Sequence, residues 1–199
     1  MVISPQSSEW ISSTTRKAIE FYMDSGSVPL PEILGVPDFV KQELNDPTGF
    51  FVILKKRHPV SGEVGIRGMM GTLSQGDALW KSVANYAITA AFFDPRTPRL
   101  KPYELNEVTI DCLIPHSFAQ QSNSFEEFVS LLEMEHPGVM ALYNNREAFM
   151  LPYVWQEFKE APQLLRVLLL QLGIPVSLLQ DNSVNYQTFS VTSISSIES

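Results

Sequence analysis

This sequence is poor in the residue types from which most catalytic and metal centres are built. It has one cysteine, Cys112, and three histidines among 199 residues. A single cysteine excludes a disulfide within the chain and a zinc site built on several cysteines. His58, His116 and His136 each stand beside a proline in an expected loop, and no two of them form a recognised metal-binding pair. No metal and no cofactor are therefore expected.

Long hydrophobic runs and an excess of basic residues are also missing. No apolar stretch approaches the roughly 18 residues that a membrane-spanning helix needs. The first residues lack the basic start and apolar run of a signal peptide. The formal net charge of −8 disfavours nonspecific nucleic-acid binding, because such binding depends on neutralising phosphates. A reducing, cytoplasmic location is expected, with neither nucleic acid nor membrane as a partner.

The spacing of the apolar residues predicts both helices and strands in an ordinary globular chain. Helices are expected over 12–24, 37–44, 78–93, 124–135 and 162–172, and strands over 50–54, 64–72, 107–115, 139–143, 148–151 and 184–194. Short, turn-rich links join many of the strands, which favours an α+β fold with a mainly antiparallel sheet flanked by helices. One domain is expected over 1–199, which can divide into two lobes, with 195–199 as a frayed tail.

Capping and turn residues are expected to set the ends of these elements. Ser12 or Ser13 would cap the first helix, Asp77 the helix over 78–93, and Ser124 with Glu127 forms a capping box. Pro115 should end a strand, Pro29-Leu30-Pro31 should form an extended linker, and Asn144-Asn145 should turn between two strands.

The most informative stretch is Ile66-Arg67-Gly68-Met69-Met70-Gly71-Thr72. Glycine costs stability inside a strand, so two glycines three residues apart indicate a place where another group approaches the bare backbone. Arg67 offers a planar set of donors that suits a carboxylate or a phosphate. The pattern predicts a strand on whose bare backbone something packs, either a strand or helix of the other lobe, or a ligand.

This stretch resembles the Leu-Arg-Gly-Cys-Ile-Gly-Thr signature of the AMMECR domain family. Further segments are similar to the family in the same order: Ala90 to Pro98, Glu104-Leu105 with the following strand, Arg146 to Pro152, and Leu172-Gly173-Ile174-Pro175. The resemblance covers about residues 14–192. It implies an α+β fold of two unequal lobes, with the signature strand facing a cleft between them. It also implies Memo-like and radical-SAM proteins as partners, since family members occur beside or fused to them.

The chain departs from the family signature at Met69, where the signature has cysteine. A thioether cannot act as a thiolate nucleophile. Cys112 lies on the apolar side of its expected strand, which favours an inert core cysteine over a reactive one. Any family reaction that used the signature cysteine should therefore be lost here.

Seven residues make up the candidate ligand site: Arg67, Gly68, Met69, Gly71, Thr72, Asp94 and Arg96. Two interpretations of the last two stay open: Asp94 and Arg96 hold a loop together, or they contact an anionic or amide-bearing ligand. Two basic stretches, 55–58 and 96–101, are likewise either solvated loop ends or an anion-binding face.

Two functions are consistent with these features. The first is a soluble recognition module whose inter-lobe cleft binds a partner protein or peptide. The second is an enzyme or enzyme accessory in a modification system, in which Arg67 orients an anion and Asp94 is an acid or base. The loss of the signature cysteine at Met69 favours the first function, and the catalytic residues of the second remain unknown.

Overall fold

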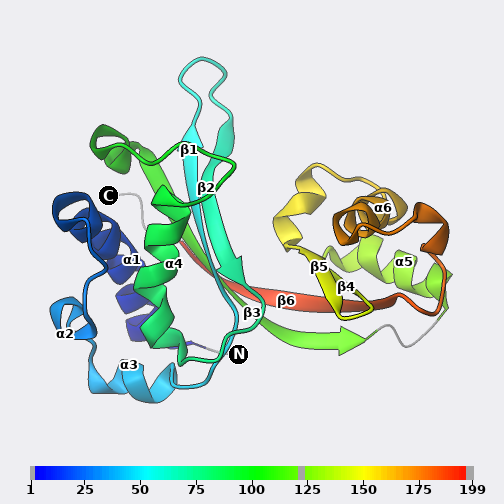
Figure 1. Cartoon of the computed structure of the whole chain (residues 1–199), viewed down its shortest axis with the longest axis horizontal. Coiled ribbons are helices and arrows are strands. Elements are labelled where there is room, and N and C mark those ends of the chain that lie inside the picture. The colour runs from blue at the N-terminus through cyan, green and yellow to red at the C-terminus, as the bar shows by residue number, and fades with distance from the viewer. Residues whose placement is uncertain (1–2, 121–123, 196–199) are drawn as a thin grey trace. The chain divides into compact units, whose positions relative to one another are not determined.

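A computed structural model describes residues 3–120 and 124–195 (Figure 1). The chain divides into two compact units: Met1–Pro115 with Thr192–Ser199, and His116–Val191. One six-stranded sheet runs through them in the order β2-β1-β3-β6-β4-β5. The pairings of β1 with β2 and β3, and of β4 with β5 and β6, are antiparallel. The α+β class with a mainly antiparallel sheet is thus confirmed.

The elements have the following bounds. The strands are β1 Phe50–Arg57, β2 Val64–Thr72, β3 Val108–Gln120, β4 Gly138–Tyr143, β5 Arg146–Met150 and β6 Asn185–Ser195. The α-helices are α1 Pro5–Ser25, α2 Pro31–Leu34, α3 Asp38–Glu43, α4 Leu79–Phe92, α5 Phe125–Glu135 and α6 Ala161–Leu172. Three short 3₁₀ helices are η1 Pro102–Glu107, η2 Pro152–Gln156 and η3 Val176–Leu178. No helix in the described ranges is both long and apolar enough to cross a membrane.

The first unit is built on the contact of α1 and α4 with each other and of α4 with β1 and β2 (Figure 1). The alanine-rich face of α4, with Ala87, Ala90 and Ala91 buried, lets this helix approach the strands closely. Alternate residues of β1, among them Val52 and Leu54, enter the same core. This packing fixes β2 at the edge of the sheet beside α4.

The second unit has its own core between α5, α6 and the strands β4, β5 and β6. The buried face of α6, which includes Leu164, Leu165 and Leu168, supplies much of it. Asn144 and Asn145 connect β4 to β5 with φ values of 47° and 61°. Such positive φ values at both central residues give a hairpin turn whose twist matches that of the strands. The predicted turn is therefore confirmed.

Several other boundaries agree with the sequence. The hairpin of 50–54 with 64–72 forms, and β2 has the predicted bounds. Ser124 and Glu127 form the predicted capping box of α5. Gly173 ends α6 in the left-handed conformation, with a φ of 69°. Of the predicted frayed tail, Ser195 belongs to β6, and 196–199 lie outside the described residues.

Two predicted helix caps are wrong. Helix α1 begins at Pro5 instead of residue 12, and the Ser4 hydroxyl accepts the amide of Ser7 at 3.2 Å. Asp77 does not cap α4. Carbonyls of an earlier segment take that role, because the amides of Leu79 and Trp80 donate to Asp46 and Leu44 at 3.4 and 3.3 Å.

Two predicted proline boundaries are also wrong. Strand β3 continues through Pro115 to Gln120. Its pairing with β1 ends at Leu113, so the missing N–H of Pro115 costs no hydrogen bond to β1. Pro31 does not belong to an extended linker, because it opens the short helix α2, where a proline in the first turn is tolerated.

Candidate functional site

A β-bulge in β2 places Arg67 outside the regular alternation of the strand. Leu54 of β1 faces Gly68, whereas the next residue, Lys55, faces Ile66, so Arg67 is the extra residue. A bulge redirects a side chain and often occurs at a sheet edge or beside a functional site. Here it turns Arg67 toward the loop that follows α4.

Arg67 joins β2 to this loop and to the following helix η1 through four hydrogen bonds. Its Nε and Nη2 atoms bind the two carboxylate oxygens of Glu104 at 3.0 and 2.7 Å. Its Nη1 donates to the carbonyl of Pro98 at 2.7 Å, and Nη2 also donates to that of Arg99 at 3.2 Å. Only 13% of the Arg67 side chain is exposed. Its guanidinium is therefore largely used by the fold.

The carboxylate of Glu104 binds two cations and one backbone amide. Besides Arg67, it binds the ammonium of Lys56 at 3.1 Å and the amide of Lys101 at 3.0 Å. The hydrogen bonds from Arg67 outweigh the effect of burial and lower the pKa of Glu104 to about 2. Glu104 is therefore a permanent anion near neutral pH.

Asp94 links the same loop to β2 two residues further along the strand. It accepts the amide of Met69 and the amide and guanidinium of Arg96, each at 2.9 Å. Arg96 also donates to the carbonyl of Met69 at 2.8 Å. Burial by itself would raise the pKa of Asp94, but the bonds from Arg96 and Met69 prevail and lower it to about 2.

Both signature glycines are pressed against other backbone. A Cβ atom on Gly68 would overlap the carbonyl oxygen of Ala90 in α4, and one on Gly71 would overlap β1 at Phe50 and Phe51. The expectation that something packs on the bare backbone is correct, but the predicted occupants, the other lobe or a ligand, are wrong: a helix and a strand of the same unit as β2 take these places. Because even a Cβ atom would overlap neighbouring backbone at both positions, the fold alone accounts for these two glycines.

The structure thus brings together only some of the seven candidate residues. Met69, Asp94 and Arg96 form one network. Thr72 lies at the far end of β2, where its hydroxyl donates to the carbonyl of Ser74 at 2.7 Å. The contacts expected of a loop-holding role for Asp94 and Arg96 are present. A role of these residues in ligand binding stays a prediction, as does the cleft between the lobes.

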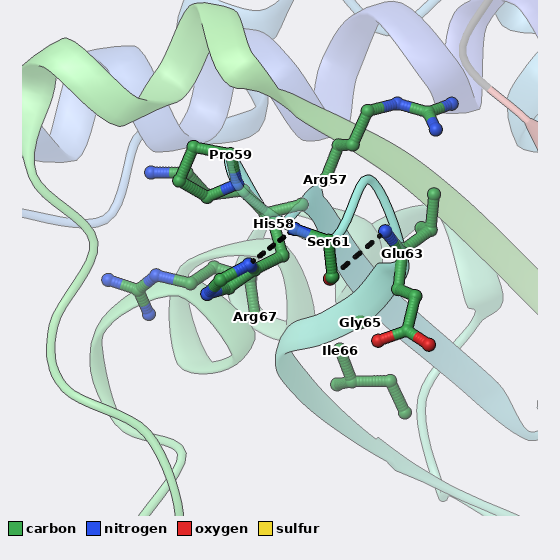
Figure 2. A pocket seen from close by; sticks show the side chains of 10 residues that line it. Arg57, His58, Pro59, Ser61, Glu63, Gly65, Ile66 and Arg67 are labelled. Atoms are coloured by element: carbon green, nitrogen blue, oxygen red, sulfur yellow. Dashed lines mark hydrogen bonds between the residues drawn. The ribbon is translucent and has the colours of Figure 1, made fainter.

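An open pocket lies on the β1–β2 hairpin, next to Arg67 (Figure 2). Its volume is about 1110 Å³. We call it the hairpin pocket; it is lined by Lys56, Arg57, His58, Pro59, Ser61, Glu63, Val64, Gly65, Ile66 and Arg67. Figure 2 shows His58, Pro59 and Arg67 on one side of the hairpin, with Arg57 reaching away from them.

Two features of the hairpin pocket favour contact with another molecule. A Cβ atom built on Gly65 would meet nothing within 4 Å, so the bare backbone there faces open space. The Nδ1 atom of His58 accepts the amides of Val60 and Ser61 at 3.3 and 3.2 Å. In the neutral ring the proton is therefore on Nε2, which becomes a hydrogen-bond donor.

Sequence reasoning missed Glu104 as the partner of Arg67 and missed the pocket itself. The basic stretch 55–58 was a usable signal, because Lys56, Arg57 and His58 line the pocket and the last two are exposed. Lys55 and Lys56 are ion-paired, with Asp111 and with Glu104 and Glu107 respectively. In the described ranges, no three histidine, cysteine, aspartate or glutamate side chains are placed to hold a metal ion.

Comparison with known proteins supports a single family over nearly the whole chain. The sequence profile of the AMMECR1 family matches residues 12–194. Protein NEQ441 of Nanoarchaeum equitans is 25% identical over 182 residues, which cover 90% of this chain and 94% of that protein. A protein of Methanocella arvoryzae is 27% identical over 177 residues, covering 88% and 84%.

The fold also has a relative among solved structures. The crystal structure of the uncharacterized protein PH0010 from Pyrococcus horikoshii superposes with a TM-score of 0.81. The match covers 96% of this chain and 92% of that one at 21% sequence identity. At this identity the likeness shows a shared fold.

Proposed function

This chain belongs to the AMMECR1 family, and from that premise we propose that it is a recognition module that binds a partner protein or peptide at the hairpin pocket. The pocket lies on an exposed hairpin whose base is held by the four hydrogen bonds of Arg67. A surface that is both exposed and rigid loses little conformational entropy on binding.

The bare backbone at Gly65 is the observation that carries this proposal. The glycines at 68 and 71 are needed because neighbouring backbone packs on them, but no such neighbour explains Gly65. A glycine inside a strand weakens the strand unless something uses the space. A ligand in the hairpin pocket would use it.

The protonation states of Asp94 and Cys112 favour binding over acid–base or thiol chemistry. With a pKa of about 2, Asp94 carries no proton to donate near neutral pH, and it is a weak base. Burial raises the pKa of Cys112 to about 12, so its thiolate is scarce. The family resemblance makes Memo-like and radical-SAM proteins the first candidates for the partner.

The test compares two glycine substitutions on the full-length protein. Peptides selected from a displayed random library on the wild-type protein should lose binding to Gly65→Val, which places a side chain in the pocket where a Cβ atom meets nothing within 4 Å. Gly76→Val is the matched control, because a Cβ atom at Gly76 also meets nothing within 4 Å and lies outside the pocket. Circular dichroism and the melting temperature verify that both variants fold.

Equal binding of the selected peptides to Gly65→Val and to the wild type would refute the hairpin pocket as the recognition site. A library that yields no binder at all would count against recognition of peptides. A small molecule retained at one equivalent by the purified protein would instead favour the enzyme alternative.

A further inference from the structure

We infer that the ligand of the hairpin pocket is an extended, acidic segment of a partner protein that adds as a strand to the outer edge of β2. This inference rests on the proposed function and specifies its ligand. It depends on two independent observations, the backbone geometry of the β2 edge and the charges around it.

The outer edge of β2 is open at Val64 and Ile66. In the hairpin, the amide of His58 donates to the carbonyl of Glu63 at 2.8 Å. Alternation along an antiparallel pair then directs the backbone groups of Gly65 toward β1 and those of Val64 and Ile66 outward. In the described part of the chain, no strand pairs with β2 on that side. An extended main chain has the complementary donors and acceptors at the same spacing.

The same edge is closed just beyond the bulge. At Met69, the carboxylate of Asp94 takes the outward amide and Arg96 takes the outward carbonyl, at 2.9 and 2.8 Å. The loop after α4 thus replaces a neighbouring strand at this position. Proteins usually cover or charge an exposed edge, yet Val64 and Ile66 are apolar and 54% and 41% exposed. A partner strand at 64–66 would account both for the open backbone edge and for the exposed apolar side chains of Val64 and Ile66.

The charges around this edge favour an acidic partner. Arg57 faces Val64 across the hairpin, and its guanidinium donates to the carbonyl of Gly62 at 2.7 Å. Arg99, whose carbonyl accepts from Arg67, holds its guanidinium over the ring of Phe93 at 5.6 Å, and Lys101 follows two residues later in the chain. None of these three cations has an ion-pair partner among residues 3–120 and 124–195. Among the described residues that line the hairpin pocket, Glu63 is the one carboxylate, against the cations Lys56, Arg57 and Arg67. In a chain with a net charge of −8, this local excess of positive charge suits an acidic partner.

Synthetic peptides of one length test both parts of the inference. The acidic probe alternates threonine with glutamate, and the basic probe alternates threonine with lysine, so both have similar strand propensity. The acidic probe should bind the full-length protein, and the basic probe should bind at least tenfold more weakly. Methylating alternate backbone nitrogens of the acidic probe should weaken it about two- to tenfold for each hydrogen bond lost. Binding should also weaken as salt is raised.

Substitutions in the protein locate the contact. Val64→Pro removes an amide that points away from β1, so the hairpin should persist while the acidic probe binds more weakly. Val64→Ala is the control for loss of the side chain, and it should bind nearly as well as the wild type. Arg57→Gln should weaken the acidic probe about two- to fivefold, the effect of an exposed ion pair. The melting temperature of each variant reports its folding.

The outcomes separate this inference from the proposed function. If the acidic and basic probes bind equally well, the acidic character of the partner is refuted. If the acidic probe binds Val64→Pro and Val64→Ala equally well, strand addition is refuted. If library-selected peptides still require Gly65 in either case, the recognition module stands and only the ligand assignment fails. A dimer that forms through β2 and excludes the acidic probe would identify a second copy of the chain as the occupant, and would refute the inference.

Discussion

Arg67 shows how one side chain can hold the fold together and shape a surface at the same time. Its guanidinium is committed to Glu104 and to two carbonyls, so it is poorly placed to hold a ligand by itself. The bulge that directs it to the loop also fixes where the open stretch of β2 ends. The arginine therefore positions the hairpin pocket, whatever the pocket binds.

Replacing Arg67 should consequently destabilise the protein. Arg67→Ala removes four hydrogen bonds and leaves the largely buried Glu104 without its main partner, which should cost about 2–4 kcal/mol of unfolding free energy. Arg67→Lys should rescue it only in part, because an ammonium cannot bind in the same planar manner. Urea unfolding measures both. Arg57→Ala, at an exposed position, is the control and should change stability by less than about 0.5 kcal/mol. A stable Arg67→Ala variant would contradict the anchoring role.

The glycines of β2 should differ sharply in their tolerance of a methyl group. Gly68→Ala places a Cβ atom on the carbonyl of Ala90, and the forced shift of α4 should cost about 1–3 kcal/mol or more. Gly65→Ala meets open space and should be neutral or slightly stabilising, by up to about 1 kcal/mol. Thermal melts of the two variants decide the matter. Similar losses at the two positions would show that Gly65 is needed by the fold.

At the scale of elements, two carboxylates attach the loop after α4 to the edge of β2. Asp94 and Glu104 both have a pKa of about 2 in the folded protein, below the ordinary values of 3.8 and 4.5. A lowered pKa means that the folded state prefers the charged form. The resulting stability is complete above the ordinary pKa values and is lost as the pH falls toward 2.

The unfolding free energy should therefore fall between about pH 5 and pH 2. The two carboxylates together should account for about 2–4 kcal/mol of that loss. Urea unfolding as a function of pH should show a weaker dependence for Asp94→Asn and Glu104→Gln than for the wild type. Asp38→Asn is the control, since Asp38 is exposed and its ion pair is with the exposed Lys41. An unchanged pH dependence in both variants would mean that the carboxylates do not hold the loop.

The β4–β5 hairpin offers a second test at this scale. Asn145 has a φ of 61°, a conformation that a β-branched residue adopts only with strain. Asn145→Val should destabilise the second unit by about 1–2 kcal/mol, whereas Asn145→Gly should be tolerated or slightly stabilising. Amide hydrogen exchange of β4 and β5 reports the change locally. Faster exchange in the glycine variant than in the valine variant would contradict the observed turn.

At the scale of the whole molecule, Cys112 is a reporter of opening of the first unit. Its side chain is 1% exposed in the core, and burial raises the pKa of its thiol to about 12. In native buffer a thiol reagent should therefore label it about 10³-fold or more slowly than it labels the unfolded chain. Mass spectrometry after timed labelling measures the rate. Fast labelling of the folded protein would refute the inert core position and reopen thiol chemistry.

The sequence predicted most elements because their signals are local. Periodic apolar residues, the capping box at Ser124 and the turn at Asn144-Asn145 each act within a few residues of the chain. Two of the wrong boundaries depend on a distant segment, whereas the early start of α1 at Pro5 and the helix opened by Pro31 are local features that the sequence interpretation missed. Carbonyls of the segment before β1 begin α4 in place of Asp77, and the end of β1 lets β3 continue through Pro115.

For the candidate site, too, local features could be predicted from the sequence, and features that depend on distant segments could not. By itself the sequence determined the fold class, the family, and the importance of the strand from Val64 to Thr72. It also indicated that something packs closely on Gly68 and Gly71, since only glycine leaves that space, but the structure was needed to identify α4 and β1 as the occupants. Tertiary structure alone decided that Arg67 turns to Glu104, because the bulge and the position of η1 are set by long-range packing. It also decided that the edge is closed at Met69 and open at Val64, which depends on where the loop after α4 comes to lie.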